Sequence, residues 1–299
     1  MENYNKNILD HPEFYIAKFT KNLDMPYVLF IHGGPGFNCG IIEYLIENNQ
    51  LFNLLNYNVI LYDQRNCGKS KKTSRVVLHQ DNIDDLERII TYIRDFCGLD
   101  ICALIGHSYG AKLLFDYYKK FTSFIPGIFV STANSILTPR LNNLMLDLSY
   151  LKKNNLDEYT KLFNTISDLD LNKIWEISEQ LTPLFQANED RPFLYWANLD
   201  CFNMVTDIQK KINLPSNTDT FISVRKDLYS SVSNFSVDID ALDLPKLRIN
   251  GFHDFIMNGH ENELSKHTKI ITFYKSAHYP HIEENNRFSE ILNEFVRHT

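Results

Sequence analysis

The sequence lacks the features that mark membrane, secreted and nucleic-acid-binding proteins. None of its apolar runs approaches the length of a membrane span, and the N-terminal residues Met1–Asn7 contain no apolar segment of a signal peptide. Lys and Arg number 30 against 37 Asp and Glu, and the net charge of −7 argues against a basic surface that binds nucleic acid. There is also no internal repeat and no low-complexity tract. We therefore expect a cytoplasmic globular protein with no nucleic-acid partner and no membrane partner.

Cysteine is scarce as well, and its pattern gives no sign of metal or redox chemistry. The cysteines are odd in number and have no Cys-x-x-Cys spacing, which argues against the usual zinc and redox motifs. They are Cys39, Cys67, Cys97, Cys102 and Cys201. Two of them lie in or beside apolar runs, as small core side chains do. We expect no bound metal and no organic cofactor.

Glycine accounts for only 11 of the 299 residues, yet two glycine clusters follow apolar runs of strand length. One cluster, Gly106-His107-Ser108-Tyr109-Gly110, lies between the run Ile101–Ile105 and the segment Ala111–Tyr118, whose apolar residues have helical spacing. Strand, sharp turn and helix in this order are typical of a nucleophile elbow, in which glycines avoid clashes around the serine. Ser108 is therefore the candidate nucleophile. The alternative is a tight turn with an idle serine, although scarce glycine gives a chance match a probability of roughly a few per cent.

The other glycine cluster, His32-Gly33-Gly34-Pro35-Gly36, follows the strand-like run Tyr27–Ile31. Its glycines leave backbone N–H groups uncovered, and such groups can stabilise a developing oxyanion. Where a nucleophile elbow is present, the oxyanion hole combines an N–H from a loop of this kind with the N–H that follows the nucleophile. We expect these donors to be Gly34 and Tyr109, with Gly33 beside the substrate. The alternative is a loop that only turns the chain.

Both clusters resemble motifs of the α/β-hydrolase superfamily, and within it of the proline iminopeptidase family. A third segment, Asp63-Gln64-Arg65-Asn66-Cys67-Gly68-Lys69-Ser70, is similar to the family's Asp-Gln-Arg-Gly-x-Gly-x-Ser, with Asn66 in place of a glycine. Asparagine tolerates positive φ better than most residues with a side chain, so we expect the loop to keep its shape. We also expect Asp63 and Arg65 to form an internal ion pair. The resemblance covers both ends of the chain, and the middle third carries no matching motif.

The resemblance implies a mostly parallel sheet flanked by helices, with an inserted helical cap. Strand-like and helix-like segments alternate, as in a doubly wound sheet, up to Ser131. From about residue 136 to 235 the pattern becomes helical and irregular, and the alternation resumes with Lys246–Asn250 and Lys269–Tyr274. We therefore expect a core domain of residues 1–135 and 236–299, and a helical cap of residues 136–235.

The acid and the base of a serine hydrolase are selected by their positions after the last two strands. Asp254 follows the strand Lys246–Asn250 through a short turn, and His278 follows the strand Lys269–Tyr274. Ligands of open α/β sheets bind where the parallel strands end, so these side chains are expected to meet Ser108 there. The chain order Ser, Asp, His is also the order found in the superfamily.

Other histidines and aspartates near these positions are alternatives. They are His253, His260, His267 and His281 for the base, and Asp238, Asp240 and Asp243 for the acid. His281 is the strongest rival because it lies three residues after His278. The family has a small residue, the catalytic His, an aromatic residue and Pro in this order, and Ala277-His278-Tyr279-Pro280 resembles that pattern.

The resemblance implies that Ser108, activated by His278 and Asp254, attacks a carbonyl and forms an acyl-enzyme that water hydrolyses. We expect an aminopeptidase of proline iminopeptidase type that acts on small peptides. An esterase, lactonase or thioesterase acting on a small acyl substrate would use the same triad. A binding protein on this fold would typically lose a triad member or the oxyanion glycines, and all of them are present.

Recognition of a protonated N-terminal imine requires carboxylates, which the family supplies largely from its cap. The nearest analogue of the family's Trp-x-x-Trp-Glu-like element is Tyr195–Asp200, which has no Glu directly after its aromatic pair. We expect Trp196, Asp200 and Glu176 to contact the substrate. The alternative for each acid is an exposed position on a solvated helix.

Overall fold

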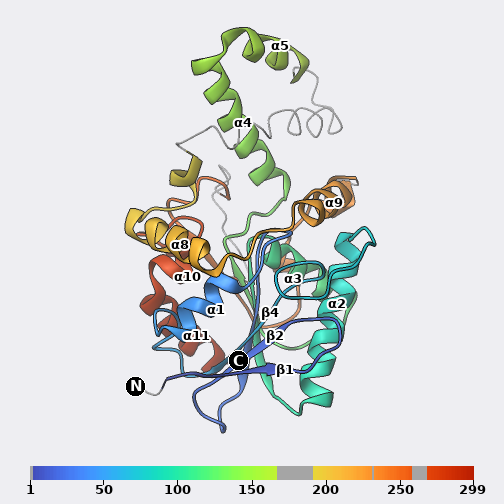
Figure 1. The fold of residues 1–299 in the computed structure, drawn as a ribbon, viewed down its shortest axis with the longest axis vertical. Helices are drawn as coiled ribbons and strands as arrows, with labels where there is room; N and C mark the ends of the chain where they lie inside the picture. Colours follow the sequence, from blue (N-terminus) through green and yellow to red (C-terminus); the bar gives the residue numbers. More distant parts are fainter. Residues whose placement is uncertain (1–2, 167–190, 231, 258–267) are drawn as a thin grey trace.

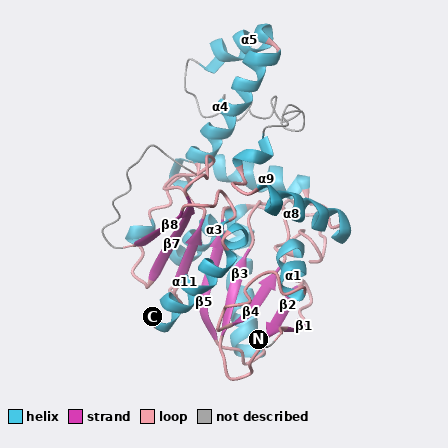
Figure 2. Ribbon diagram, turned by 90° about the vertical axis from the view of Figure 1, so that its left-hand side faces the viewer, coloured by secondary structure: helices cyan, strands magenta, loops and turns pink. Residues whose placement is uncertain are grey.

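The computed structural model describes residues 3–166, 191–230, 232–257 and 268–299, which form an α/β fold around one sheet (Figures 1 and 2). This eight-stranded sheet has the order β1-β2-β4-β3-β5-β6-β7-β8. The strands are β1 (Asn5–Leu9), β2 (Ile16–Thr20), β3 (Tyr27–Ile31), β4 (Asn58–Tyr62), β5 (Ile101–His107), β6 (Gly127–Val130), β7 (Lys246–Gly251) and β8 (Lys269–Phe273). β1 pairs antiparallel with β2, and β2 pairs antiparallel with β4. The remaining neighbours in this order, from β4 and β3 to β7 and β8, pair in parallel. The mostly parallel sheet expected from the sequence is therefore confirmed.

Helices cover both faces of the sheet. Outside residues 136–235, the described helical elements are α1 (Gly40–Glu47), α2 (His79–Thr91), the π-helical turn η1 (Tyr92–Phe96), α3 (Tyr109–Lys120), the 3₁₀ turn η4 (Ile239–Ala241), α10 (Pro280–Glu283) and α11 (Asn285–Arg297). α2 and α3 lie on one face, and α1 and α11 lie on the other (Figure 1). Among the described residues, no helix combines the length and the apolar sequence needed to span a bilayer.

The central strands β3, β4 and β5 are largely apolar because each face of the sheet has its own core. Along β3, Leu29 and Ile31 pack with side chains of α2 and α3, whereas Val28 and Phe30 pack with side chains of α1 and α11. Successive residues of a strand point to opposite faces, so a strand covered on both faces buries every side chain. All five residues of β3 are buried. This double cover fixes the carboxyl ends of β3 and β5, from which the two glycine-rich segments emerge.

Between β6 and β7 the chain leaves the sheet, and we refer to residues 136–235 of this stretch as the inserted segment. Its described helical elements are α4 (Leu137–Asn154), α5 (Leu156–Ile166), the 3₁₀ turn η2 (Arg191–Leu194), α8 (Leu199–Ile212), α9 (Thr218–Tyr229) and the 3₁₀ turn η3 (Val232–Asn234). Ser135 and Ser236 form an isolated antiparallel bridge where the segment leaves and rejoins the core. α4 and α5 project away from the sheet, whereas α8 and α9 lie between them and the ends of the strands (Figures 1 and 2).

Candidate active site

Ser108 lies in a sharp turn between β5 and α3, as the sequence predicts for an elbow. β5 ends at His107 and α3 begins at Tyr109, so Ser108 alone makes the turn, with φ 55° and ψ −117°. The flanking glycines are required by close backbone contacts. A Cβ atom at Gly106 would lie 2.4 Å from the carbonyl oxygen of Gly110, and a Cβ atom at Gly110 would lie 2.2 Å from that of Ile31. Side chains at either position would force the turn away from the sheet.

His278 and Asp254 form a buried pair on the loops after β8 and β7. The His278 Nδ1 atom lies 2.9 Å from the Asp254 Oδ2 atom. The other carboxylate oxygen of Asp254 accepts the backbone N–H groups of Ile256 and Met257, each at 3.1 Å. Since a carboxylate beside Nδ1 favours a proton on that nitrogen, Nε2 is left as the basic atom of the ring. Among the described residues, the His278 ring forms a hydrogen bond only with Asp254. In enzymes without substrate, the hydrogen bond between a catalytic base and its nucleophile is often long, and it shortens when substrate binds.

The loop that carries His278 is tied to the inserted segment. The His278 backbone N–H donates to the carbonyl oxygen of Tyr195 at 3.1 Å, and the Tyr195 ring meets the imidazole edge-on at 5.4 Å. Glu283 accepts the N–H of Ala277 at 2.8 Å on one carboxylate oxygen and those of Ala197 and Asn198 on the other, at 2.7 and 2.9 Å. Burial raises the pKa of the Glu283 carboxyl, against the effect of these N–H groups. No spacing in the sequence singles out Tyr195 or Glu283 for this role.

His281, the strongest alternative base, also borders the cavity described below, but it is almost fully buried. Its side chain is 1 % exposed and its ring packs near the rings of Phe30 and Phe288, at 5.4 and 5.9 Å. Burial lowers its pKa to about 3, so the ring is neutral at physiological pH. Of the other histidine alternatives, His253 is exposed, and His260 and His267 lie outside the described residues.

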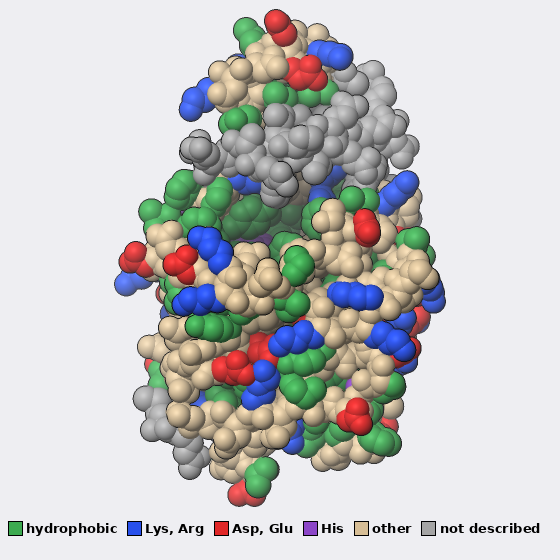
Figure 3. All heavy atoms as spheres, viewed as in Figure 1, with side chains coloured by type: hydrophobic (Ala, Val, Ile, Leu, Met, Phe, Trp, Pro, Cys, Tyr) green, Lys and Arg blue, Asp and Glu red, His purple; other side chains and the backbone are tan. Residues whose placement is uncertain are grey.

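The predicted oxyanion donors border the same cavity as the nucleophile and the histidine. The cavity has a volume of about 690 Å³, and its wall includes Gly33, Gly34, Ser108, Tyr109 and His278. Figure 3 shows a hollow in the upper middle of this face, with hydrophobic side chains along its wall. A Cβ atom at Gly33 would lie 3.1 Å from the Ser108 Cβ atom, so the glycine loop approaches the serine closely. This arrangement can receive a carbonyl group between the serine and the backbone N–H groups.

The side chain of Tyr109 is held from behind by α2 and α3. Its hydroxyl lies 2.9 Å from His79 Nδ1 and accepts the Asn82 Nδ2–H, also at 2.9 Å. The opposite ring nitrogen of His79 lies 2.7 Å from an Asp116 carboxylate oxygen, which in turn pairs with Lys112. Because the carboxylate favours a proton on His79 Nε2, Nδ1 accepts the Tyr109 hydroxyl proton. The sequence gives no signal for this network.

Asp63 stabilises the loops around the site, but not through the partner expected from the sequence. Its two carboxylate oxygens accept the backbone N–H groups of Cys39 and Lys69, each at 2.7 Å. Arg65 pairs instead with Asp85 on α2, with its Nε atom 2.7 Å from the carboxylate. The predicted ion pair between Asp63 and Arg65 is therefore wrong, because α2 presents a carboxylate to the guanidinium while Asp63 is taken up by backbone donors.

Asn66, which replaces the family's glycine, adopts the left-handed conformation expected of it. Its φ is 62°, and its side-chain amide forms two hydrogen bonds with the backbone of Thr73, at 2.7 and 3.1 Å. Asparagine is among the side-chain-bearing residues that most readily adopt this conformation. The side chain thus adds a link across the loop that a glycine could not make.

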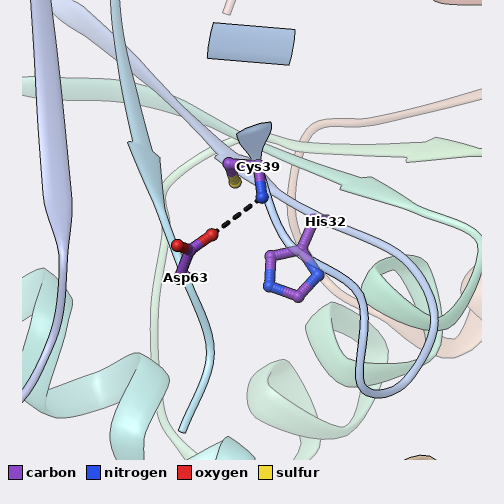
Figure 4. A group of neighbouring side chains, drawn as sticks. All are labelled: His32, Cys39 and Asp63. Carbon is purple, nitrogen blue, oxygen red and sulfur yellow. Dashed lines mark hydrogen bonds between the residues drawn. The ribbon is translucent and has the colours of Figure 1, made fainter. Parts of the chain in front are cut away.

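His32, Cys39 and Asp63 form a compact cluster whose potential ligand atoms lie within 4.8 Å of one another (Figure 4). Each of these groups already has hydrogen-bond partners. His32 Nε2 accepts the N–H of Gln64 at 3.1 Å, and the Cys39 thiol donates to the Tyr62 carbonyl oxygen at 3.0 Å. Burial raises the pKa of the Cys39 thiol and lowers that of His32, so this thiol is not a ready thiolate ligand. The cluster connects the glycine loop to the Asp63 loop.

Of the residues expected to contact substrate, two line the cavity. Gly33 and Trp196 belong to its wall, and the Trp196 ring stacks on that of Tyr279 at 4.3 Å. Asp200 is exposed in the first turn of α8 and is absent from the wall, and Glu176 lies outside the described residues. Within the described part of the chain, Asp147 is the one carboxylate on the wall, and it pairs with Arg191.

Comparison with known proteins agrees with this architecture. The family model described as alpha/beta hydrolase fold matches residues 26–285. A proline iminopeptidase of Saccharolobus solfataricus is 27% identical over 282 residues, which cover 89% of this chain and 83% of the relative. A crystal structure of a proline iminopeptidase-related protein from Thermus thermophilus has a TM-score of 0.65 at 16% identity and covers 99% of this chain and 98% of that one. An esterase from Exiguobacterium antarcticum has a TM-score of 0.62 at 14% identity and covers 99% and 100% of the two chains. The chain therefore belongs to the α/β-hydrolase fold family.

Proposed function

We propose that this protein is a serine hydrolase in which Ser108 is the nucleophile, His278 the base and Asp254 the acid. The observation that carries the proposal is the buried pair of His278 and Asp254, located on loops at the same sheet edge as the elbow of Ser108. Ser108 and His278 also border one cavity. Three groups in this chain order and at these strand ends are typical of the hydrolases that use a nucleophile elbow.

The chemistry follows from the roles of these groups. The Ser108 hydroxyl oxygen attacks a carbonyl carbon as its proton passes to Nε2 of His278, and Asp254 stabilises the resulting imidazolium. The backbone N–H groups of Gly34 and Tyr109 receive the negative charge that forms on the carbonyl oxygen. The leaving group departs with the proton from His278, and a water molecule, deprotonated by the same nitrogen, then hydrolyses the acyl-enzyme.

We propose that the substrate is a small peptide from which an N-terminal residue, often proline, is released. Support comes from relatives called proline iminopeptidases, two of which align over 89% and 93% of this chain. The inserted segment acts in this proposal as the cap of the site, with Trp196 facing the substrate. A protonated N-terminus needs a carboxylate near the scissile bond. Asp147 lies on the wall and Glu176 belongs to the same segment, so these two acids are the candidates.

A second candidate function is hydrolysis of a neutral ester, lactone or thioester. The observation that favours it is the character of the cavity wall. In the described part of the chain, the one carboxylate on the wall is already paired with an arginine, and much of the remaining wall is apolar. The apolar members include Phe37, Ile41, Phe202 and Val205. Such a wall accommodates a neutral acyl group without a buried charge.

Charge at the substrate's N-terminus separates the two candidates. We expect a proline arylamide with a free N-terminus to be cleaved with a kcat/KM at least tenfold above that of its N-acetylated form, because acetylation removes the cation that a buried carboxylate requires (about 1.4 kcal/mol for each tenfold). Short and long nitrophenyl esters are assayed beside both. A preference for the N-blocked amide or for neutral esters would contradict the aminopeptidase proposal and leave the serine hydrolase standing.

Covalent labelling tests the nucleophile independently of the substrate. A fluorophosphonate is expected to modify Ser108 alone, since only a serine beside a base and an oxyanion hole reacts quickly with such a probe. Mass spectrometry of the labelled peptide identifies the site. If Ser108→Ala protein is labelled as fast as the wild type, the serine hydrolase proposal is wrong.

A further inference from the structure

The connection between α8 and α9 contacts the end of the glycine cluster and the residues that follow it. The backbone N–H of Asn217 donates to the carbonyl oxygen of Gly36 at 2.7 Å, and the Asn38 side chain donates to that of Leu214 at 3.2 Å. Two hydrogen bonds thus join the inserted segment to the loop that carries the proposed oxyanion donor Gly34. A cap that only covered the site would not need them.

Gly36 has no room for a side chain because the first turn of α9 packs on its backbone. A Cβ atom at Gly36 would lie 2.5 Å from the carbonyl oxygen of Asn217 and 3.0 Å from the backbone nitrogen of Phe221. Its φ of 81° also favours glycine. The last glycine of the cluster is therefore explained by a contact between two parts of the chain that are far apart in sequence.

The side chain of Asn217 joins α9 to the loop that contains Asn66. Its Oδ1 atom caps α9 by accepting the N–H of Thr220 at 2.9 Å, and its Nδ2–H donates to the carbonyl oxygen of Asn66 at 2.9 Å. Asn66 belongs to the loop in which Asp63 accepts N–H groups from both sides. Through one residue, the helix is connected to the glycine loop and to the loop behind it.

The body of α9 is anchored near the second proposed oxyanion donor. The Ser223 hydroxyl donates to the carbonyl oxygen of Val77 at 2.8 Å, and an Asp227 carboxylate oxygen accepts the backbone N–H of His79 at 2.8 Å. His79 is the residue whose ring holds the Tyr109 hydroxyl. α9 therefore contacts the supports of both donors, at Gly36 on one side and at His79 on the other.

We infer that α9 is a positioning element for the oxyanion hole and that Asn217 is its principal positioning residue. The inference rests on the proposed function, because it assigns the oxyanion role to the N–H groups of Gly34 and Tyr109. Misplacing such a donor weakens the interaction with the transition state more than the binding of substrate, since the charge develops only during the reaction. A disturbed Asn217 must therefore lower kcat and spare KM.

The substitution Asn217→Asp separates this role from helix stability. Aspartate is as good an N-cap as asparagine, so α9 keeps its cap, but the carboxylate has no N–H for Asn66 and repels its carbonyl oxygen. We expect kcat and the rate of fluorophosphonate labelling to fall in parallel, by about tenfold, because small misplacements of this kind have effects of that order. KM stays within twofold and the melting temperature stays near that of the wild type.

Asn155→Asp is the matched control. Asn155 caps α5 in the same way, accepting the N–H of Glu158 at 3.2 Å, and α5 projects away from the sheet (Figure 1). The control is expected to keep the wild-type kcat, KM and labelling rate. Asn217→Ser is the second variant, since serine also caps a helix but is too short to keep the link to Asn66.

Two results overturn the inference. One is a wild-type kcat and labelling rate in both folded Asn217 variants. The other is a loss of kcat that Asn155→Asp reproduces, because the effect would then come from changing a cap anywhere in the inserted segment. Failure of the proposed function is recognised separately, by a Ser108→Ala protein that keeps the wild-type labelling rate.

Discussion

Three histidines near the proposed site are buried in a way that links their protonation to folding. Burial lowers the pKa of His32, His107 and His281, in the last case to about 3, because an imidazolium ion would lose its hydration there. In the unfolded chain each titrates near 6.5. Between the folded and unfolded pKa values the unfolded state binds more protons, so the free energy of unfolding decreases as the pH falls below about 6.5.

Replacing His281 by Phe is expected to weaken this pH dependence. The ring lies near Phe30 and Phe288, so phenylalanine suits the site, and the variant loses one proton-binding group of the unfolded state. Near pH 5 the slope of the free energy of unfolding against pH is expected to decrease by about 1.4 kcal/mol per pH unit. Urea unfolding at pH 7, 6 and 5 measures it in both proteins. Parallel curves would mean that His281 is protonated alike in the folded and unfolded states.

At the residue level, the sequence predicted local geometry well and some distant partners poorly. The family pattern around His278 selects it over His281, and the structure pairs His278 with Asp254. The motif predicts an ion pair between Arg65 and Asp63, yet Arg65 binds Asp85 of α2, because spacing carries no information on which helix packs beside a loop. The sequence places Asp200 in the segment that resembles the family's aromatic element, but the residue is exposed in the first turn of α8, where a negative charge interacts favourably with the helix dipole.

At the scale of elements, the elbow between β5 and α3 depends on the space that its glycines leave. Gly110→Ala would raise helix propensity, yet its Cβ atom would lie 2.2 Å from a backbone oxygen of β3, which cannot move without the sheet. We expect a loss of stability of about 1 to 3 kcal/mol and a decrease in kcat of at least about tenfold, because Ser108 and the N–H of Tyr109 shift with the turn. Circular dichroism melts and steady-state kinetics measure the two effects.

Gly98→Ala is the control for this prediction. Gly98 also has a positive φ, 65°, but a Cβ atom there would meet no atom of the described residues within 4 Å. Alanine at this position costs about 1 to 2 kcal/mol through its backbone conformation alone. Its kcat is expected to equal that of the wild type, whereas an equal loss of kcat in both variants would show that stability, and not the geometry of the elbow, governs the rate.

The sequence predicted the elements of the sheet because their signal is local. Continuous apolar runs identify strands that are covered on both faces, and β3, β4 and β5 contain such runs. The contacts between α9 and the glycine loop had no local signal. They join residues about 180 positions apart, such as Gly36 and Asn217, through backbone atoms that every residue possesses. Only the folded arrangement brings them together.

At the scale of the whole molecule, the structure has parts of unequal stability. The sheet contributes two extensive cores, whereas α4 and α5 project from it around the small set of buried leucines Leu144, Leu148, Leu151 and Leu162. Local opening of an element costs less where few apolar contacts hold it. We expect amides of α5 to exchange with solvent at least about 100-fold faster than those of β3 and β5, as measured by hydrogen exchange and mass spectrometry. Equal protection would mean that α5 unfolds only together with the sheet.

The pairing of β6 with β7 determines how freely the inserted segment can vary. Gly127 is in register with Lys246, and the bridge between Ser135 and Ser236 closes the base of the inserted segment. The pairing of the two strands therefore does not depend on the chain between these serines. The chain entropy lost on closing a loop grows slowly, by about 0.6 kcal/mol for each doubling of its length. Insertions and deletions far from Ser135 and Ser236 thus change the free energy of folding little. Substrate preference can therefore diverge while the sheet persists. The exception is the connection between α8 and α9, which contacts Gly36. A change in its length would disturb the rate of the reaction as well as the choice of substrate.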